Sequence, residues 1–417
     1  MDRASPMQFP TDTPSKVDWQ TPVGSLPNET WDVAVVGAGP AGSIAALDLA
    51  LLGHKTLLID SRRFPREKVC GDGLLGDALR CLERHGLYEQ VAAEAHPLPE
   101  AMIYSPSRHS FPIASRFLIL RRDRFDTMMA RAAVDRGAVF AHGNASDIQT
   151  GGDGFAELRF GSEAEPIRAR IVVIATGANV ALAQKLGLVS NTRPYAFALR
   201  CYVRSKRTVE HLILSYDREL LPGYAWIMPL GEGLFNVGCG TLYTDKRRPS
   251  ANVNQMFRKF IDSFPVALEL FRHGEQITPL RGAPLRCNLK GTLPFKPPNI
   301  LLAGETIGTT FPFSGEGIGK AMESGELAAA TIHDSLAAGD LTHLHRYPER
   351  LESEFRSQYR GYIAAQRWFS KAWLHDFVCS RISRSRYLQQ RFKNFVSESG
   401  DPRTVYAISS LLMSFIR

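Results

Sequence analysis

Strand-length apolar runs alternate with helical patterns along the first part of the chain. The run DVAVV at 32–36 is rich in β-branched residues and ends at Gly37, which is typical of a short buried strand. Residues 40–52 (PAGSIAALDLALL) follow with an almost wholly apolar helical face, and TLLI at 56–59 predicts the next strand. Strand, helix and strand in this order predict a βαβ unit, and therefore a parallel sheet with a right-handed crossover.

The rest of the chain predicts a second, antiparallel sheet and a helical C-terminal part. Between 190 and 245, apolar and polar positions alternate as they do in strands with one buried face. An apolar run at 300–303 predicts another buried parallel strand. The other expected elements are helices at 74–97, 122–137, 251–273, 315–337 and 341–395, and short strands over 138–174.

The composition is that of a folded globular protein. Of the 417 residues, 44% are hydrophobic and 22% are charged, which excludes a disordered chain, collagen or a coiled coil. No run approaches the roughly 18–20 apolar residues that a membrane-spanning helix needs, and the N-terminal residues resemble no secretory signal. The six cysteines contain no C-x-x-C pair, so neither a disulfide framework nor a zinc site is expected. We therefore expect a cytoplasmic protein.

The net charge of +8 is concentrated at the C-terminal end. Residues 341–417 contain 13 Lys and Arg against 6 Asp and Glu, whereas the preceding 340 residues contain 37 against 36. Together with Trp368, Trp373 and the apolar stretch at 407–416, this excess favours a lid over an apolar site or a reversible contact with an anionic membrane surface. A solvated helical face is the plainer alternative. No nucleic-acid-binding module is predicted, so nucleic acid is not an expected partner.

A glycine-rich turn joins the first predicted strand to the first helix. In GAGPAG at 37–42, Gly37 permits a tight turn, Gly39 lets the backbone approach a pyrophosphate, and Gly42 lets the helix pack against the strand. The helix N-terminus adds amide hydrogens and a positive dipole. Asp60 lies 23 residues after Gly37, at the end of the second strand, where a carboxylate accepts hydrogen bonds from ribose hydroxyls. These features predict a bound dinucleotide.

A second motif indicates which dinucleotide to expect. The segment ILLAGE at 300–305 is a strand that ends in an acid, and an acid in this place can hold the ribityl chain of a flavin. Gly315 and Gly317 then let the amides of a new helix approach the pyrimidine edge of the flavin. A nicotinamide nucleotide does not need this distant second element. The expected cofactor is therefore FAD, with NAD(P)H or another electron donor as the reductant.

The chain resembles the p-hydroxybenzoate-hydroxylase-type flavoproteins, and within them the geranylgeranyl reductase family. Residues 304–318 match that family's G-D-x-x-G-x-x-x-P-x-x-G-E-G-I motif, with Glu305 in place of Asp. KVCGDG at 68–73 matches its K-x-C-G-x-G motif, and YAWIMP at 224–229 matches its Y-x-W-x-F-P motif, with Met228 in place of Phe. The motifs are spread over most of the chain, so the resemblance concerns both predicted sheets.

The pattern and the resemblance together imply an α/β fold with three parts. These are a Rossmann-type FAD-binding domain with a parallel sheet (31–189 plus 286–340), an antiparallel-sheet substrate domain (190–285) and a basic helical C-terminal segment (341–417), preceded by a flexible arm (1–30). The residues that the fingerprint and the resemblance assign to FAD are Gly37, Gly39, Ala41, Gly42, Asp60, Ser61, Lys68, Cys70, Gly71, Arg122, Gly177, Gly304, Glu305, Pro312, Gly315, Gly317 and Ile318.

The same resemblance implies that Cys70, Tyr224 and Trp226 act on the substrate. A thiol beside the flavin could give a proton to a substrate carbon after hydride transfer, although most cysteines simply pack as small apolar residues. Tyr224 and Trp226 are two apart on a predicted strand and project from one face, where they line an apolar cavity or belong to an ordinary core. Asp72 is either an acid or a turn residue between two glycines.

The predicted activity is FAD-dependent reduction, or the reverse dehydrogenation, of carbon–carbon bonds in a hydrophobic substrate such as a polyprenyl lipid. The alternative is a flavin-dependent monooxygenase of an aromatic or biosynthetic intermediate. It is weakened because ATG at 175–177 lacks the acid of the Asp-Gly motif that such hydroxylases carry. A flavin halogenase is disfavoured, since no lysine lies between Lys68 and Lys185 to hold hypohalous acid. A flavin-fold binding protein without turnover is a third class.

Overall fold

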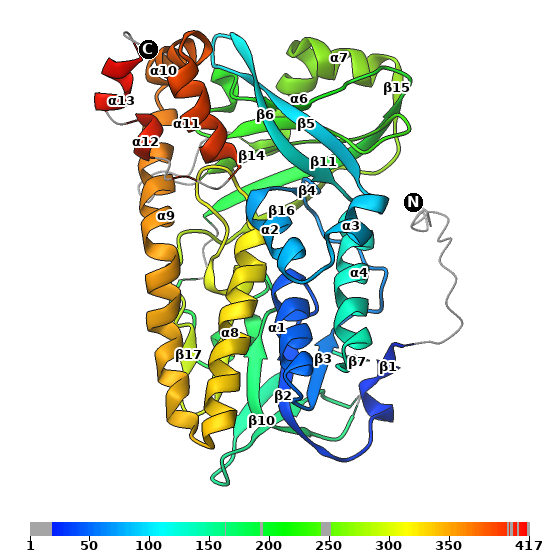
Figure 1. Ribbon diagram of the computed structural model, residues 1–417. Coiled ribbons are helices and arrows are strands. Elements are labelled where there is room, and N and C mark those ends of the chain that lie inside the picture. The colour runs from blue at the N-terminus through cyan, green and yellow to red at the C-terminus, as the bar shows by residue number, and fades with distance from the viewer. Residues whose placement is uncertain are drawn as a thin grey trace.

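A computed structural model describes residues 19–162, 164–191, 195–242, 252–397, 400, 403–406 and 408–414. Two β-sheets lie one above the other in Figure 1, with the parallel sheet below, the antiparallel sheet above, and the long helix α9 (Tyr347–Phe369) running beside both. The predicted fold class, α/β with a Rossmann-type sheet, a second sheet and C-terminal helices, is confirmed.

The lower sheet is built around the predicted βαβ unit. Strand β2 (Thr30–Val36) and strand β3 (Thr56–Asp60) pair in parallel, and α1 (Pro40–Leu51) connects them. The sheet has the order β1-β7-β3-β2-β10-β18-β17, and a β8–β9 hairpin pairs with β10. The other strands are β1 (Thr21–Pro22), β7 (Val139–His142), β8 (Asp147–Thr150), β9 (Ala156–Arg159), β10 (Ile167–Ile174), β17 (Phe295–Lys296) and β18 (Ile300–Leu302).

Residues 19–29 of the expected N-terminal arm are attached to this sheet. β1 pairs in parallel with β7 at the sheet edge. The Trp19 ring packs against Phe64 and Phe140, with centroid distances of 6.1 and 4.8 Å, and Gln20 Nε2 donates to the Phe64 carbonyl at 2.8 Å. Aromatic packing therefore fixes a segment whose prolines suggested only a flexible lead-in. Residues 1–18 lie outside the described residues.

Helix α8 (Ile318–Ala338) packs against α1, and small residues permit the close approach. A Cβ on Gly325 would lie 2.3 Å from the Ala41 carbonyl oxygen, so no larger residue fits between the helices. Helix α9 is joined to the same layer because the Tyr347 hydroxyl donates to the Leu302 carbonyl at 2.8 Å. Helix α9 is thereby held against strand β18 of the lower sheet.

The upper sheet has the order β15-β11-β14-β13-β12-β5-β6-β4, with β16 also paired to β11. It is antiparallel as predicted, except that β12 and β5 pair in parallel. Its strands are β4 (Gly73–Leu74), β5 (His96–Tyr104), β6 (Ser110–Ile119), β11 (Ala196–Ser205), β12 (Leu212–Ser215), β13 (Tyr224–Pro229), β14 (Leu234–Leu242), β15 (Gly274–Gln276) and β16 (Arg281–Leu285).

Three of these strands, β4, β5 and β6, come from the segment that the sequence places in the FAD-binding domain. The helical pattern expected over 74–97 is interrupted, giving α2 (Gly76–Arg84) and α3 (Tyr88–Glu94), after which β5 begins. Pro97 and Pro99 cannot continue a helix because they lack a backbone N–H. Helix α4 (Arg122–Asp135) then returns the chain to the lower sheet.

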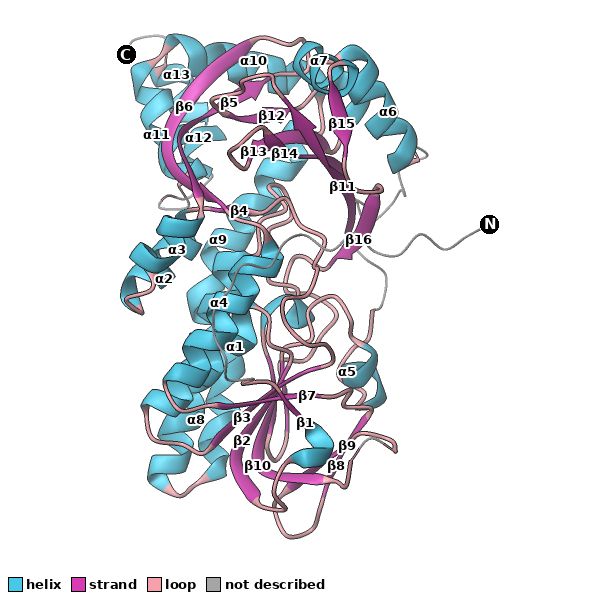
Figure 2. Ribbon diagram, turned by 90° about the vertical axis from the view of Figure 1, so that its right-hand side faces the viewer, coloured by secondary structure: helices cyan, strands magenta, loops and turns pink. Residues whose placement is uncertain are grey.

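Helices cover the outer face of the upper sheet and one of its ends. Helices α6 (Val253–Ser263) and α7 (Pro265–Arg272) form a core with the side chains of Leu199, Cys201 and Val203 from β11. The C-terminal helices gather beside β6 (Figure 2). They are α10 (Ala372–Arg384), α11 (Arg386–Val396), α12 (Arg403–Tyr406) and α13 (Ile408–Met413). Residues 407 and 415–416 of the apolar stretch expected at 407–416 lie outside the described residues.

None of the helices among the described residues combines the length and the apolar character needed to cross a membrane.

Candidate functional site

A cavity of about 570 Å³ extends from the C-terminal end of β2 to the inner face of the upper sheet. It brings together most of the residues that the sequence singled out, although they come from positions far apart in the chain. Gly42 and Pro312 are the two that do not line it. The lining includes Gly37, Gly39, Ala41, Asp60, Ser61, Lys68, Cys70, Gly71, Arg122, Gly177, Tyr224, Trp226, Gly304, Glu305, Gly315, Gly317 and Ile318.

The turn between β2 and α1 forms an open cradle at one end of the cavity. Gly37 has a φ of +108°, and a Cβ there would lie 2.3 Å from the Ala175 carbonyl oxygen. A Cβ on Gly42 would lie 1.8 Å from the Gly37 carbonyl oxygen. A Cβ on Gly39, by contrast, would meet only the Arg66 guanidinium, at 4.0 Å. The backbone is therefore bare where an anion can approach the N-terminus of α1, as a pyrophosphate requires.

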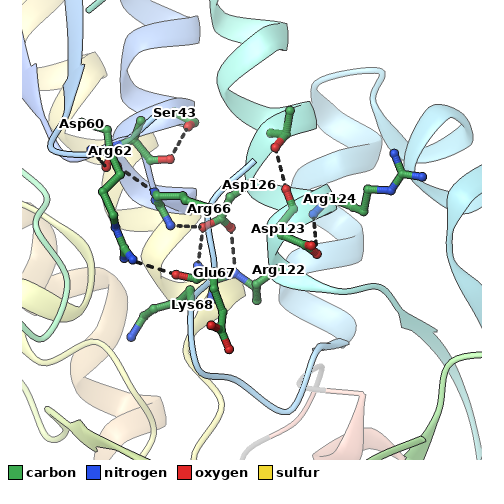
Figure 3. A network of polar contacts seen from close by, with 12 residues as sticks. Ser43, Asp60, Arg62, Arg66, Glu67, Lys68, Arg122, Asp123, Arg124 and Asp126 are labelled. Atoms are coloured by element: carbon green, nitrogen blue, oxygen red, sulfur yellow. Dashed lines mark hydrogen bonds and ion pairs between the residues drawn. The ribbon is translucent and has the colours of Figure 1, made fainter. Parts of the chain in front are cut away.

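Asp60 is buried at the end of β3 and is already engaged by the protein. Its carboxylate accepts hydrogen bonds from the amides of Ala38 and Arg62 and from Arg66 Nε, each at 3.1 Å. Arg66 in turn reaches Asp126 on α4 at 3.0 Å (Figure 3). The network ties the fingerprint turn, the loop after β3 and α4 together. A ribose contact by Asp60 stays a prediction, and it would have to use the remaining lone pairs.

Arg122 extends this network to the loop that carries Cys70. Its Nε and Nη2 atoms donate to the two carboxylate oxygens of Asp126 at 2.7 and 2.9 Å (Figure 3), and its charge also acts on the Cys70 side chain. Burial opposes the charge, but Asp126 and Cys70 outweigh this effect and hold the pKa of Arg122 above its usual range. The cavity therefore has a permanent cation beside the thiol.

Asp72 is a buried anchor of the Cys70 loop. Its φ is +70°, and its carboxylate accepts from the Tyr202 hydroxyl at 2.6 Å and from Asn236 Nδ2 at 2.7 Å. Asn236 also donates to the Cys70 carbonyl at 2.8 Å. Burial raises the pKa of Asp72, although these hydrogen bonds oppose the rise. The residue thus does more than occupy a turn, because it fixes the loop to the upper sheet.

Tyr224 and Trp226 lie on the inner face of the upper sheet, as their spacing predicts. The two rings have a centroid distance of 5.9 Å. Trp226 Nε1 donates to Asn236 Oδ1 at 2.9 Å, and the Tyr224 hydroxyl donates to the Ser314 carbonyl. Gly238 on β14 makes room for the indole, since a Cβ there would lie 2.3 Å from Trp226 Cζ2. The aromatic wall is thereby hydrogen-bonded to the neighbouring strand β14 and to the loop at Ser314.

Glu305 stands at the end of β18, beside the fingerprint. It accepts from the Arg286 amide at 3.3 Å and lies 3.7 Å from Lys68 Nζ. Gly304, with a φ of +68°, allows this approach, because a Cβ there would lie 2.8 Å from the Ala41 Cβ. The two dinucleotide motifs therefore pack directly against each other, so that a single ligand can contact both of them.

Sequence reasoning missed two features of the cavity. One is an apolar end formed by Phe313, Tyr362, Phe392 and Phe395, where the Phe311 and Tyr362 rings stack at 3.8 Å. The other is Arg200, a buried cation on β11. The C-terminal segment was expected to cover an apolar site, but no pattern identified these particular residues, and no motif marked Arg200.

Comparisons with known proteins agree with this geometry. Residues 30–216 match the FAD binding domain family. A menaquinone reductase of Mycolicibacterium smegmatis is 30% identical over 364 residues, which cover 82% of this chain and 84% of the relative. A digeranylgeranylglycerophospholipid reductase of Methanopyrus kandleri is 27% identical and covers 82% of this chain and 87% of its own.

Solved structures share the fold over nearly the whole chain. A geranylgeranyl bacteriochlorophyll reductase-like protein of Thermoplasma acidophilum has a TM-score of 0.74 at 24% identity and covers 93% of this chain and 96% of its own. A flavin-dependent brominase has a TM-score of 0.73 at 20% identity, with coverages of 93% and 98%. At these identities the likeness concerns the fold.

The fold, the open pyrophosphate cradle and these relatives define an FAD-dependent oxidoreductase. Within that class, the chain belongs to the geranylgeranyl reductase family of the p-hydroxybenzoate-hydroxylase-type flavoproteins. The residues present fit FAD, because the backbone is bare at Gly39 and the second motif lies directly beside the first at Gly304.

Proposed function

We propose that the protein reduces carbon–carbon double bonds of a hydrophobic, isoprenoid-like substrate. The observation that carries this proposal is the continuity of the cavity, which passes from the FAD motifs, past Cys70 and Trp226, to the aromatic cluster on α9 and α11. An extended apolar chain fits such a lining better than a compact polar metabolite does. The relatives named menaquinone reductase and digeranylgeranylglycerophospholipid reductase support the same substrate class.

The roles of the side chains follow from their positions. When bound, FAD supplies hydride-transfer chemistry. In our proposal Cys70 holds a proton at Sγ, and Arg122, whose charge acts on this side chain, orients the thiol. Tyr224 and Trp226 pack on the substrate and exclude water from the reacting bond. The proton from Cys70 then completes the saturation of the second carbon.

The experiment that tests the proposal needs no assumption about the natural electron donor. The FAD-loaded protein is photoreduced without oxygen and mixed with menaquinone or with geranylgeranyl diphosphate. We expect reoxidation of the flavin, with one saturated double bond formed per flavin, measured by absorbance and by mass spectrometry. Reoxidation only after oxygen is admitted, with label from ¹⁸O₂ in the product, would contradict the reductase proposal and support the monooxygenase alternative.

We also propose that a hydrophobic substrate reaches the cavity from a membrane surface contacted by α10. Trp373 and Phe377 are separated by one helical turn and are 68% and 41% exposed. Lys371 and Arg384 are exposed at the two ends of this helix. Exposed aromatic side chains flanked by cations are typical of peripheral contact with anionic lipids.

A further inference from the structure

Arg200 is a buried cation in the cavity that the proposed reaction does not use. It lies on β11, is 1% exposed and lines the cavity. Its Nη2 atom contacts Glu67 Oε1 at 2.9 Å, and its guanidinium lies 4.3 Å from the centre of the Tyr202 ring. Tyr202 fixes the arginine on one side by stacking, and Glu67 holds one of its nitrogens.

The other two nitrogens of the Arg200 guanidinium donate to no acceptor among the described residues. Nε and Nη1 are buried and have no hydrogen-bond partner within the described part of the chain. A buried donor left without a partner costs stability, and more so when it is charged. Glu67 offsets only part of the cost of burying the Arg200 charge, because its carboxylate is shared with Arg281. The guanidinium is thus held in place with two donors that no acceptor among the described residues satisfies.

The cavity changes from polar to apolar along the order of the strands. Arg200 lies on β11, Trp226 lies on β13, and the aromatic residues Phe392 and Phe395 lie beyond β12 and β5, where α11 contacts β6. On the intervening strand β14, Gly240 lines the cavity without a side chain, while the Trp226 indole lies over Gly238. A ligand that spans the sheet would therefore have its polar end at β11 and its apolar end at α11.

We propose that Arg200 binds an oxygen acceptor on the polar end of the substrate, while the apolar chain lies toward Phe392 and Phe395. The acceptor is a phosphate oxygen or a quinone carbonyl, both of which accept two hydrogen bonds from a guanidinium. The inference rests on the proposed function, because it concerns which amphiphile occupies that site. In this inference Arg200 recognises the head group of the substrate, and Cys70 remains the proton donor.

The test compares two probes that differ only in their head group. Geranylgeranyl diphosphate and geranylgeraniol are titrated into FAD-loaded protein, with tryptophan fluorescence as the readout, and menaquinone serves as the carbonyl probe. We expect Arg200→Met to weaken diphosphate binding by about 10- to 100-fold, as loss of a charged hydrogen bond predicts, and to change geranylgeraniol binding less than about threefold. If menaquinone weakens and the diphosphate does not, the acceptor is a carbonyl.

Matched variants keep the result interpretable if Arg200→Met folds poorly. Glu67→Gln removes the competing carboxylate and leaves Arg200 in place, so we expect diphosphate to bind more tightly. Arg204→Gln, an exposed arginine on the same strand, should change neither probe. Equal losses for both isoprenoid probes, or lost FAD retention with unchanged probe binding, would overturn the assignment. The single-turnover reduction of menaquinone by the unaltered protein tests the proposed function separately.

Discussion

Cys70 is the residue on which the proposed proton transfer depends, and its surroundings fit that role. Its loop is held by Asp72 and Asn236, and the charge of Arg122 acts on its side chain. Of the six cysteines it alone is not fully buried. The other five occupy core positions where a substrate has no access.

Replacement of Cys70 should separate chemistry from cofactor binding. We expect Cys70→Ala to lower kcat about 100-fold or more, in the range that general-acid catalysis contributes, with the FAD content unchanged. Cys70→Ser keeps a proton and a hydrogen-bonding group beside Arg122, so it should lose less. Stopped-flow reoxidation of photoreduced protein measures both. Full turnover in Cys70→Ala would remove the thiol from the mechanism.

At this scale the sequence predicted the glycines well and the buried polar residues poorly. Gly37, Gly39 and Gly304 follow spacing rules that reflect backbone geometry, which short motifs record. Asp72 and Arg200 are defined by partners more than 100 residues away, at Tyr202 and Glu67. No local pattern carries that information, so only the assembled structure reveals their environment.

At the scale of elements, α1, α2 and α8 are joined by a polar cluster behind the site. His85 follows α2 and contacts Asp48 on α1 at 2.9 Å, while Glu326 on α8 pairs with Arg84 at 2.7 Å. Burial lowers the pKa of His85, but the hydrogen bonds to Asp48 and to the Cys81 carbonyl outweigh it and raise the pKa above its usual value. A protonated His85 therefore stabilises this contact.

The raised pKa predicts how stability depends on pH. The contribution of His85 is fully present below its ordinary pKa and is lost as the pH rises through the raised value. We expect His85→Gln to cost about 1 kcal/mol at pH 5.5 and clearly less at pH 8.5, measured by urea unfolding. His109→Gln, an exposed histidine, is the control and should show no such trend. An equal cost at both pH values would contradict the ion pair.

Elements were predicted best where strand and helix are neighbours in sequence. The unit β2–α1–β3 is local, so its apolar periods suffice to define it. Strands β5 and β6 were missed because β5 depends on pairing with β12, which lies more than 100 residues further along the chain. The apolar positions of β5 and β6 follow the expected helix at 74–97 without a clear change of period, so no strand was predicted there.

At the scale of the whole molecule, we propose that the basic C-terminal helices form a face that contacts lipid. The exposed aromatic residues on α10 lie on the same group of helices that lines the apolar end of the cavity. A neutral body and a basic C-terminal segment would orient the protein at an anionic surface. Substrate could then pass along α11 without crossing water.

Vesicle flotation tests this orientation. The double variant Trp373→Ser and Phe377→Ser should bind vesicles of anionic phospholipid about tenfold more weakly than the unaltered protein, because two apolar anchors are lost. Binding should also fall with added salt. Leu293→Ser is the matched control, since Leu293 is 61% exposed but lies far along the chain from α10. Equal flotation of all three proteins would leave α10 with no part in membrane contact.

The repeated passage of the chain between the two sheets has a consequence for how the molecule unfolds. It leaves the lower sheet after β3 to form β4–β6, returns for β7–β10, leaves again for β11–β16 and comes back at β17 and β18. Neither sheet is a continuous segment, so a cut at residue 189 would leave β5 without β12. The two sheets should therefore melt together in one calorimetric transition, and neither is a module that could be exchanged between relatives.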